Sequence, residues 1–341
     1  MSTTLTQSRY MCTCIILGNL LNIAYGINPG FSVLDECDVE LPGDDELWEA
    51  TTPSQWESLI DNKSRPPLVS LGKAASMFFT DSDRIETLPR GGWSWSAFAT
   101  SAVIHQVAIA VWYLTQGQQA CNNVTQDARE RSRPESTRIE AALSQCRELL
   151  IRRSGGNDKA WNEEDSPLLF NACAILRVSY GRAFMTVRFL DRSLLIKDNP
   201  QDKLAILQRY HAASQKRGQL ITLAVNRALE GFAIPIRAGI FLIQKTAAFK
   251  WSVEHALAAW DAALLVTKWV HAIETLHESG RIIAPEEKQV VQNVRHLLNE
   301  VDTEHARGHS LAAALARVWA NLYDDTWVWG GASAGSNTFH I

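Results

Sequence analysis

Apolar residues recur along this chain at three- and four-residue intervals, the spacing that places them on one face of an α-helix. One such face covers residues 139–150 and ends at the Gly155-Gly156 pair, and another covers residues 290–301. Alternation of apolar and polar residues, the pattern of a half-buried β-strand, is nearly absent. The pattern therefore predicts an all-α protein.

Prolines mark where several of these helices begin. Proline at the first helical position loses no hydrogen bond, and a preceding Ser, Thr or Asn can cap the helix. Thr52-Pro53, Ser166-Pro167 and Asn199-Pro200 have this form, and Ala284-Pro285 is followed by two glutamates where the helix dipole favours them. Starts and periodicity together predict helices over residues 5–26, 53–60, 68–79, 94–117, 134–153, 167–196, 200–229, 236–248, 252–278, 285–303 and 309–323.

The segment 253–273 is apolar on most sides, which predicts a central helix. Residues 27–52 have no helical period and are rich in proline and glycine, so we expect an irregular loop there. The predicted architecture is a multi-helix globular bundle. Any internal boundary is expected in the polar linker 118–133, and residues 331–341 are expected to form a flexible tail.

Composition allows a large core and argues against a self-sufficient DNA-binding domain. Hydrophobic residues make up 46% and charged residues 21% of 341 residues, which are ordinary globular values. The formal net charge is −4, whereas phosphate contacts require a basic surface. We therefore predict no direct nucleic-acid contact. Six cysteines without C-x-x-C spacing suit reduced thiols in the cytosol or nucleus.

The longest apolar stretch, residues 97–114, is nearly long enough to cross a bilayer. His105 and Gln106 lie near its centre. Because a polar pair in that place suits a folded interior, we predict a buried core helix and no membrane contact.

Carboxylate clusters raise one enzymatic alternative. Asp44-Asp45-Glu46 and Asp324-Asp325 resemble the magnesium-binding clusters of class I terpenoid synthases. The first cluster follows Leu41-Pro42-Gly43, however, which predicts a loop rather than the rim of a long helix. The second metal motif of those enzymes is absent from the sequence.

Histidines offer a second chemical candidate. His305 and His309 are four residues apart, as two metal ligands on one helical face would be. Gly308 lies between them, and Arg281 takes the place of the second histidine in the zinc-protease pattern that His277-Glu278 begins. We interpret these side chains as polar residues at helix ends. With no nucleophile elbow and no phosphate loop either, we predict no enzyme, no metal and no cofactor in this chain.

A family resemblance begins at residues 26–56. Residues 38–50 read DVELPGDDELWEA, and Trp56 follows. This segment resembles the regulatory (middle homology) region of fungal zinc-finger transcription factors, where a proline loop precedes an acidic "LP..D.LW.A" stretch. Residues 166–182 resemble that family's arginine-bearing helix, and residues 319–330 resemble its C-terminal signature. The residues that carry the resemblance are Leu41, Pro42, Asp45, Leu47, Trp48, Ala50, Trp56, Arg177, Trp319, Asp325, Trp327 and Trp329.

The resemblance implies that these signature residues hold the fold. Leu47, Trp48 and Trp56 are expected to anchor the loop on the helical core. Asp44 and Asp45 are expected to be surface or capping groups. The regulatory domain would cover residues 1–330 and lack its first helices, because the family's region begins before the point that matches Met1.

The resemblance also implies a function. We expect a nuclear regulatory domain of an RNA polymerase II transcription regulator, acting through other transcription proteins or a small-molecule effector, with homodimers allowed. Zinc and DNA recognition would belong to an upstream part of such a regulator. The alternative is a helical ligand-binding or protein-interaction module, in which residues 251–269 and their tryptophans line an apolar pocket instead of packing as core.

Overall fold

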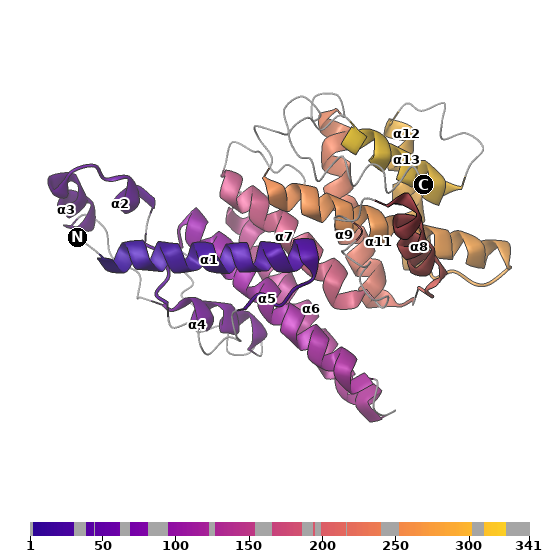
Figure 1. Cartoon of the computed structure of the whole chain (residues 1–341), viewed down its shortest axis with the longest axis horizontal. Helices are drawn as coiled ribbons and strands as arrows, with labels where there is room; N and C mark the ends of the chain where they lie inside the picture. Colours follow the sequence, from indigo (N-terminus) through magenta and orange to yellow (C-terminus); the bar gives the residue numbers. More distant parts are fainter. Residues whose placement is uncertain are drawn as a thin grey trace. The chain divides into compact units, whose positions relative to one another are not determined.

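The computed structural model divides the chain into two units, residues 1–176 and residues 177–341. Within the described residues it contains twelve α-helices, one 3-10 helix and no β-strand, which confirms the all-α prediction (Figure 1). The described residues are 3–30, 39–43, 45–61, 69–80, 95–122, 127–153, 166–185, 194, 199–215, 217–239, 252–301 and 310–324.

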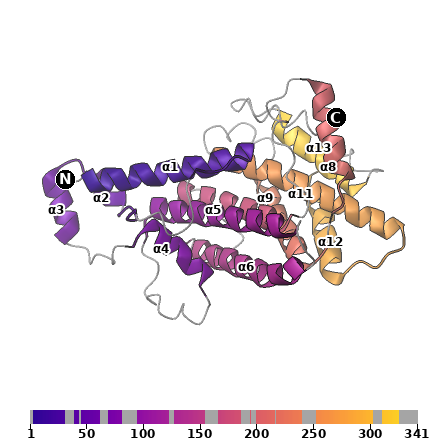
Figure 2. The same cartoon turned by 60° about the horizontal axis from the view of Figure 1, so that its bottom comes forward.

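The first unit is organised around one uncharged helix, α5. Figure 2 shows α5 between α1 and α6, and α5 packs against both of them and against α4. Its residues 99–111 are all buried. The helices of this unit are α1 (Thr3–Tyr25), α2 (Asp45–Glu49), α3 (Pro53–Asp61), α4 (Leu71–Ser76), η1 (Met77–Phe79), α5 (Ala97–Asn122), α6 (Asp127–Arg153) and the first part of α7 (Pro167–Phe184).

The loop that follows α1 is more ordered than predicted. Glu40 and Ser70 form an isolated antiparallel bridge. In that bridge the amide of Leu41 donates to the carbonyl of Val69 at 2.9 Å. The expectation of an irregular loop over residues 27–52 is wrong for Asp45–Glu49, which forms α2. Five residues are too few to show a helical period, and the two acidic residues of the first turn suit a helix N-terminus.

The second unit is organised around α11, as the prediction of a central helix required. Its α11 packs against α9 and α13, and α12 packs against the same two helices. The side chains of Trp260, Trp269 and Trp319 are at most 4% exposed and form part of its core. The helices of this unit are the end of α7, α8 (Pro200–Ala212), α9 (Gln219–Ala238), α11 (Val253–Glu278), α12 (Pro285–Glu300) and α13 (Leu311–Asp324).

Several predicted helix boundaries differ from the structure. The helix expected over 167–196 ends at Phe184. The single helix expected over 200–229 is two helices, because the chain turns at Gly218, whose φ of 150° suits glycine. The next helix was expected to begin at 236, but α9 continues through Pro235 and ends before Gly239, whose φ is 96°. Both α5 and α6 extend into the segment 118–133 that was expected to be a linker.

Two helices in the described residues are long and apolar enough to cross a membrane, judged by length and composition alone: residues Ala97–Gln116 of α5, and α11. Each is mostly buried in the structure, by 72% and 56% of its most apolar window. Core helices of folded units have the same properties, so this composition reflects burial inside protein.

Candidate functional site

Charged side chains of α11 attach three other elements of the second unit to it. Asp261 accepts a hydrogen bond at 3.1 Å from Nε of Arg182, near the end of α7. The side chains of this pair are 13% and 9% exposed. Because burying either charge alone would be costly, the pair fixes the end of α7 against α11.

Lys268, two turns further along α11, holds the end of α8. Its Nζ donates to the carbonyl oxygens of Tyr210 and His211, the latter at 3.3 Å, and lies 4.4 Å from the Tyr210 ring centroid. The last carbonyls of a helix carry partial negative charge, which a cation satisfies. Burial lowers the pKa of Lys268 from its ordinary value.

Glu274 caps a third element, α13. Its two carboxylate oxygens accept from the backbone amides of Leu311 at 2.6 Å and Ala312 at 3.2 Å. A carboxylate in this position satisfies amides that have no partner within their own helix. Asp261, Lys268 and Glu274 thus connect α11 to α7, α8 and α13.

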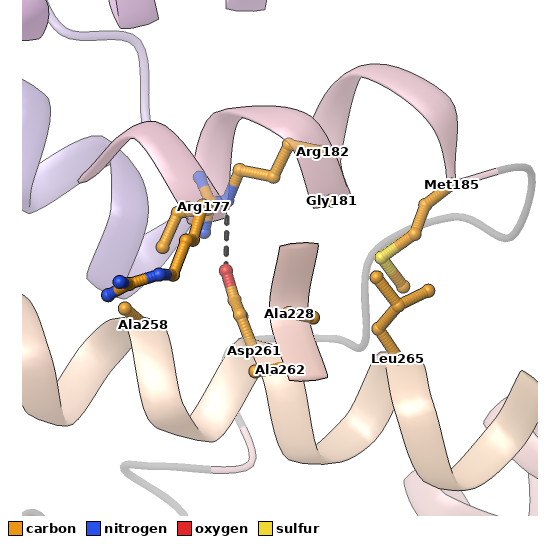
Figure 3. Close-up of a pocket in the computed structure, with 10 residues that line it drawn as sticks. Arg177, Gly181, Arg182, Met185, Ala228, Ala258, Asp261, Ala262 and Leu265 are labelled. Carbon is orange, nitrogen blue, oxygen red and sulfur yellow. Dashed lines mark hydrogen bonds and ion pairs between the residues drawn. The ribbon is translucent and has the colours of Figure 1, made fainter. Parts of the chain in front are cut away.

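A cleft opens beside the Arg182–Asp261 pair, between α7, α9 and α11 (Figure 3). It contains about 280 Å³ of space, part of it open to solvent, and its enclosed part holds roughly a single water molecule. Small and apolar residues make up most of its walls. The described lining residues are Arg177, Val178, Gly181, Arg182, Met185, Ala228, Ala258, Asp261, Ala262 and Leu265.

Arg177 is the exception among the charged groups of the cleft. Among the described residues, no group forms a hydrogen bond or ion pair with its guanidinium. Its side chain crosses α9 at Gly231, where an added Cβ would lie 3.1 Å from Arg177 Cδ. Burial, and secondarily the charge of Arg177, lowers the pKa of His255 to about 3. The Arg177 end of the cleft is therefore electropositive.

The signature residue Trp319 belongs to the core of this unit. It lies on α13, is 1% exposed, and stacks on Phe232 of α9 with ring centroids 4.3 Å apart and an interplanar angle of 30°. Trp260 and Trp269 are buried as well, and no tryptophan is among the described residues of the cleft wall. In the described part of α11, the aromatic side chains therefore pack as core.

One known protein family matches most of the second unit. Residues 191–340 match the family model described as the fungal transcription factor C-terminal domain. This part of the chain is similar to fungal transcription factor C-terminal domains. The match begins after residues 26–56 and 166–182 and includes residues 319–330, so it covers one of the three segments that carry the sequence resemblance. No curated protein and no solved structure matches the chain.

In the first unit, outside the residues that match the family model, the signature residues Asp45 and Trp48 contact Arg9 of α1. Asp45 Oδ1 accepts from Arg9 Nη2 at 2.6 Å, and the Arg9 guanidinium carbon lies 4.6 Å from the Trp48 ring centroid and 5.1 Å from that of Phe98. Trp48 is 50% exposed, so the expectation of a core anchor is wrong for it. The reason is that α2 is a short surface helix without a buried residue.

The other signature residues of the first unit lie closer to the core. Pro42 is buried, whereas Leu41, Leu47, Ala50 and Trp56 are partly buried. The indole N–H of Trp56 is shielded from solvent and has no hydrogen-bond partner among the described residues. Asp44, Asp325, Trp327, Trp329, His305 and His309 lie outside the described residues.

The described residues contain no group of three or more His, Cys, Asp or Glu side chains that could hold a metal ion. The side chains of four cysteines are described, and all four are free thiols. The sequence analysis did not single out Arg182, Asp261, Lys268 or Glu274. For the three residues of α11, the signal was the presence of charges in an otherwise apolar helix, with Asp261 and Lys268 seven residues apart and so on one face of it.

Proposed function

We propose that the chain is a regulatory part of an RNA polymerase II transcription regulator and acts in the nucleus through protein or small-molecule contacts. The observation that carries the proposal is the match of residues 191–340 to the fungal transcription factor C-terminal domain. That family consists of transcription factor domains, which implies a nuclear role and is typically non-enzymatic. DNA recognition would come from a zinc-binding part outside these residues.

The charge of the chain supports a regulatory role rather than a DNA-reading one. The chain has 33 Lys and Arg against 37 Asp and Glu residues, so it has no excess of positive charge for phosphate contacts. Several of its positive side chains are also committed to internal contacts, such as Arg182, Lys268 and Arg217. Of these, Arg217 donates at 2.8 Å to Glu287, which is only 3% exposed.

A tethering experiment tests the proposal. Residues 1–341 are fused to an unrelated DNA-binding domain in a fungal cell that carries a reporter gene with the matching site. We expect reporter output to change, up or down, relative to the DNA-binding domain alone. A fusion with Trp319→Asp, which places a charge in the core, serves as the control and is expected to abolish the change.

Protein levels and nuclear fluorescence of both fusions are measured in the same cells, so that a loss of protein is not counted as a loss of regulation. An intact, nuclear wild-type fusion with unchanged reporter output would refute the regulatory role. The chain tagged with a fluorescent protein alone should accumulate in the nucleus, and its exclusion from the nucleus would contradict the proposed location.

The second candidate is a ligand-binding module without a transcriptional role. The electropositive cleft between α7, α9 and α11 favours it. Ligand binding without any reporter response would support this candidate over the first.

A further inference from the structure

We infer that the cleft between α7, α9 and α11 is a binding site for a small carboxylate with a short apolar tail, whose carboxylate group pairs with Arg177. The inference rests on the proposed function, because it names the chemical class of the small molecule through which the regulatory unit would act. The observation that carries it is an arginine beside an apolar wall whose guanidinium has no hydrogen-bond or ion-pair partner among the described residues.

The charges of the cleft are unbalanced. Its described lining residues include two arginines and one carboxylate, and that carboxylate, Asp261, is already engaged by Arg182. Arg177 is partly buried, yet it has no hydrogen-bond or ion-pair partner among the described residues. A guanidinium withdrawn from water in this way is stabilised best by a planar anion that accepts two parallel hydrogen bonds, which is the geometry of a carboxylate.

The walls of the cleft limit the size of the ligand. The small residues Gly181, Ala228 and Ala258 form part of the sides. Figure 3 shows Arg177 toward one end and Met185 beside Leu265 at the other. The enclosed part holds roughly one water molecule, so a ligand of a few carbon atoms occupies the open part. Met185, unbranched and flexible, can shift to admit the apolar tail.

Phosphate is a poorer fit for the same site. A phosphate group is charged on every side, whereas among the described lining residues of this cleft the unpaired donor group belongs to Arg177. Its remaining oxygens would face the apolar walls without hydrogen bonds, which is costly. The occupant is therefore a monocarboxylate, and inorganic phosphate serves as the comparison anion.

Two further variants test the Arg177 end of the cleft. A Cβ at Gly231 would lie 3.1 Å from Arg177 Cδ, so in Gly231→Ala the Arg177 side chain must shift by a few tenths of an ångström. Arg209 on α8 is exposed and is not among the described lining residues of the cleft. Arg209→Gln therefore removes one positive charge outside the site and serves as the control.

The experiment is a titration of the whole chain with sodium butyrate, butyramide and inorganic phosphate, followed by calorimetry and by the NMR signals of the cleft methyl groups. We expect butyrate to bind at least about tenfold more tightly than either comparison compound. Arg177→Gln should weaken butyrate binding by about tenfold or more, Gly231→Ala by a smaller factor, and Arg209→Gln by less than about twofold. No described residue would lose a hydrogen-bond or ion-pair partner with Arg177, so Arg177→Gln is expected to fold.

Equal binding of butyrate and butyramide, or unchanged butyrate affinity in Arg177→Gln, would overturn the inference. The tethered reporter separates this failure from failure of the proposed function, because the reporter response needs no butyrate. A responding reporter with a cleft that binds no carboxylate would sustain the regulatory role and reject the ligand site alone.

Discussion

The central helices α5 and α11 are alike in length and apolar character but differ in how they use polar residues. The uncharged α5 buries Thr100, Ser101, His105 and Gln106, all neutral. By contrast, α11 carries charges, and three of them connect it to α7, α8 and α13. Neutral polar groups can specify where two helices pack against each other. Paired charges can do the same, but removing one charge of a buried pair leaves the other unpaired and destabilises the unit.

The neutral design of α5 is clearest at His105. Asn19 Nδ2 of α1 lies 2.9 Å from His105 Nδ1, and both side chains are buried. Burial lowers the pKa of His105 to about 3, so the ring is uncharged at neutral pH. The contact therefore specifies the pairing of α1 and α5 without placing a charge between them.

The largest effect should follow from removing a charge of α11. In Asp261→Ala, the guanidinium of Arg182, which is 8% exposed, loses its carboxylate partner. We expect the free energy of unfolding of the second unit to fall by about 3 kcal/mol. Urea unfolding, with hydrogen exchange of α11 amides to identify the unit, measures it.

The double variant Arg182→Met with Asp261→Leu is the control for this prediction. Because it removes both charges and keeps side-chain volume, it should recover most of the loss. A single variant as stable as the wild type would show that the pair is dispensable and would remove the contrast with α5.

Acid should destabilise the first unit through His105. The folded-state pKa is about 3 and the unfolded value is about 6.5, so between these limits only the unfolded chain binds the proton. Stability is therefore present above pH 6.5 and is lost as pH falls, by up to about 1.4 kcal/mol per pH unit. From pH 6.5 to 5 we expect a loss of about 2 kcal/mol, measured by hydrogen exchange of α5 amides.

His105→Gln should remove this part of the pH dependence, since glutamine does not titrate and can still bond to Asn19. An unchanged slope in this variant would mean that another group senses the acid. The second unit contains His255, whose pKa is also lowered to about 3, so exchange must be measured on α5 itself.

Helix type and position were largely predictable because their signals are local. The predicted helix 252–278 and the observed Val253–Glu278 differ by one residue, since Ser252 and the apolar period mark its start. The break before α9 was missed because it depends on distant groups: Arg217 in this connection pairs with Glu287, seventy residues away in sequence.

The candidate site was less predictable than the fold. The sequence resemblance included Arg177 but did not indicate what this side chain contacts. Its surroundings depend on Gly231 and Asp261, which lie on two other helices. Trp48 and Trp319 were given the same structural role, yet one is 50% exposed and the other 1% exposed. Which elements flank a tryptophan decides its burial, and that is a tertiary property.

Removing an unpaired polar group from α5 should stabilise the first unit modestly. Gln106 is fully buried, and neither its amide nitrogen nor its oxygen has a hydrogen-bond partner among the described residues. Gln106→Met keeps the length of the side chain and removes the desolvation cost, so we expect a gain of about 1 kcal/mol in urea unfolding. A loss of similar size would reveal that the folded protein satisfies this amide.

The smallest effect, at Glu274, separates the value of charge from that of hydrogen bonding on α11. Glu274→Gln keeps one acceptor oxygen for the amides of Leu311 and Ala312 but loses the negative charge at the start of α13. Losing the charge near the helix dipole and the second acceptor oxygen should together lower the free energy of unfolding by about 0.5–1 kcal/mol. Glu274→Ala should lower it further. Hydrogen exchange in α13 measures both. If Gln is as good as Glu, this residue is a hydrogen-bond cap whose charge is incidental, and Asp261 and Lys268 are then the charged side chains by which α11 holds its neighbours.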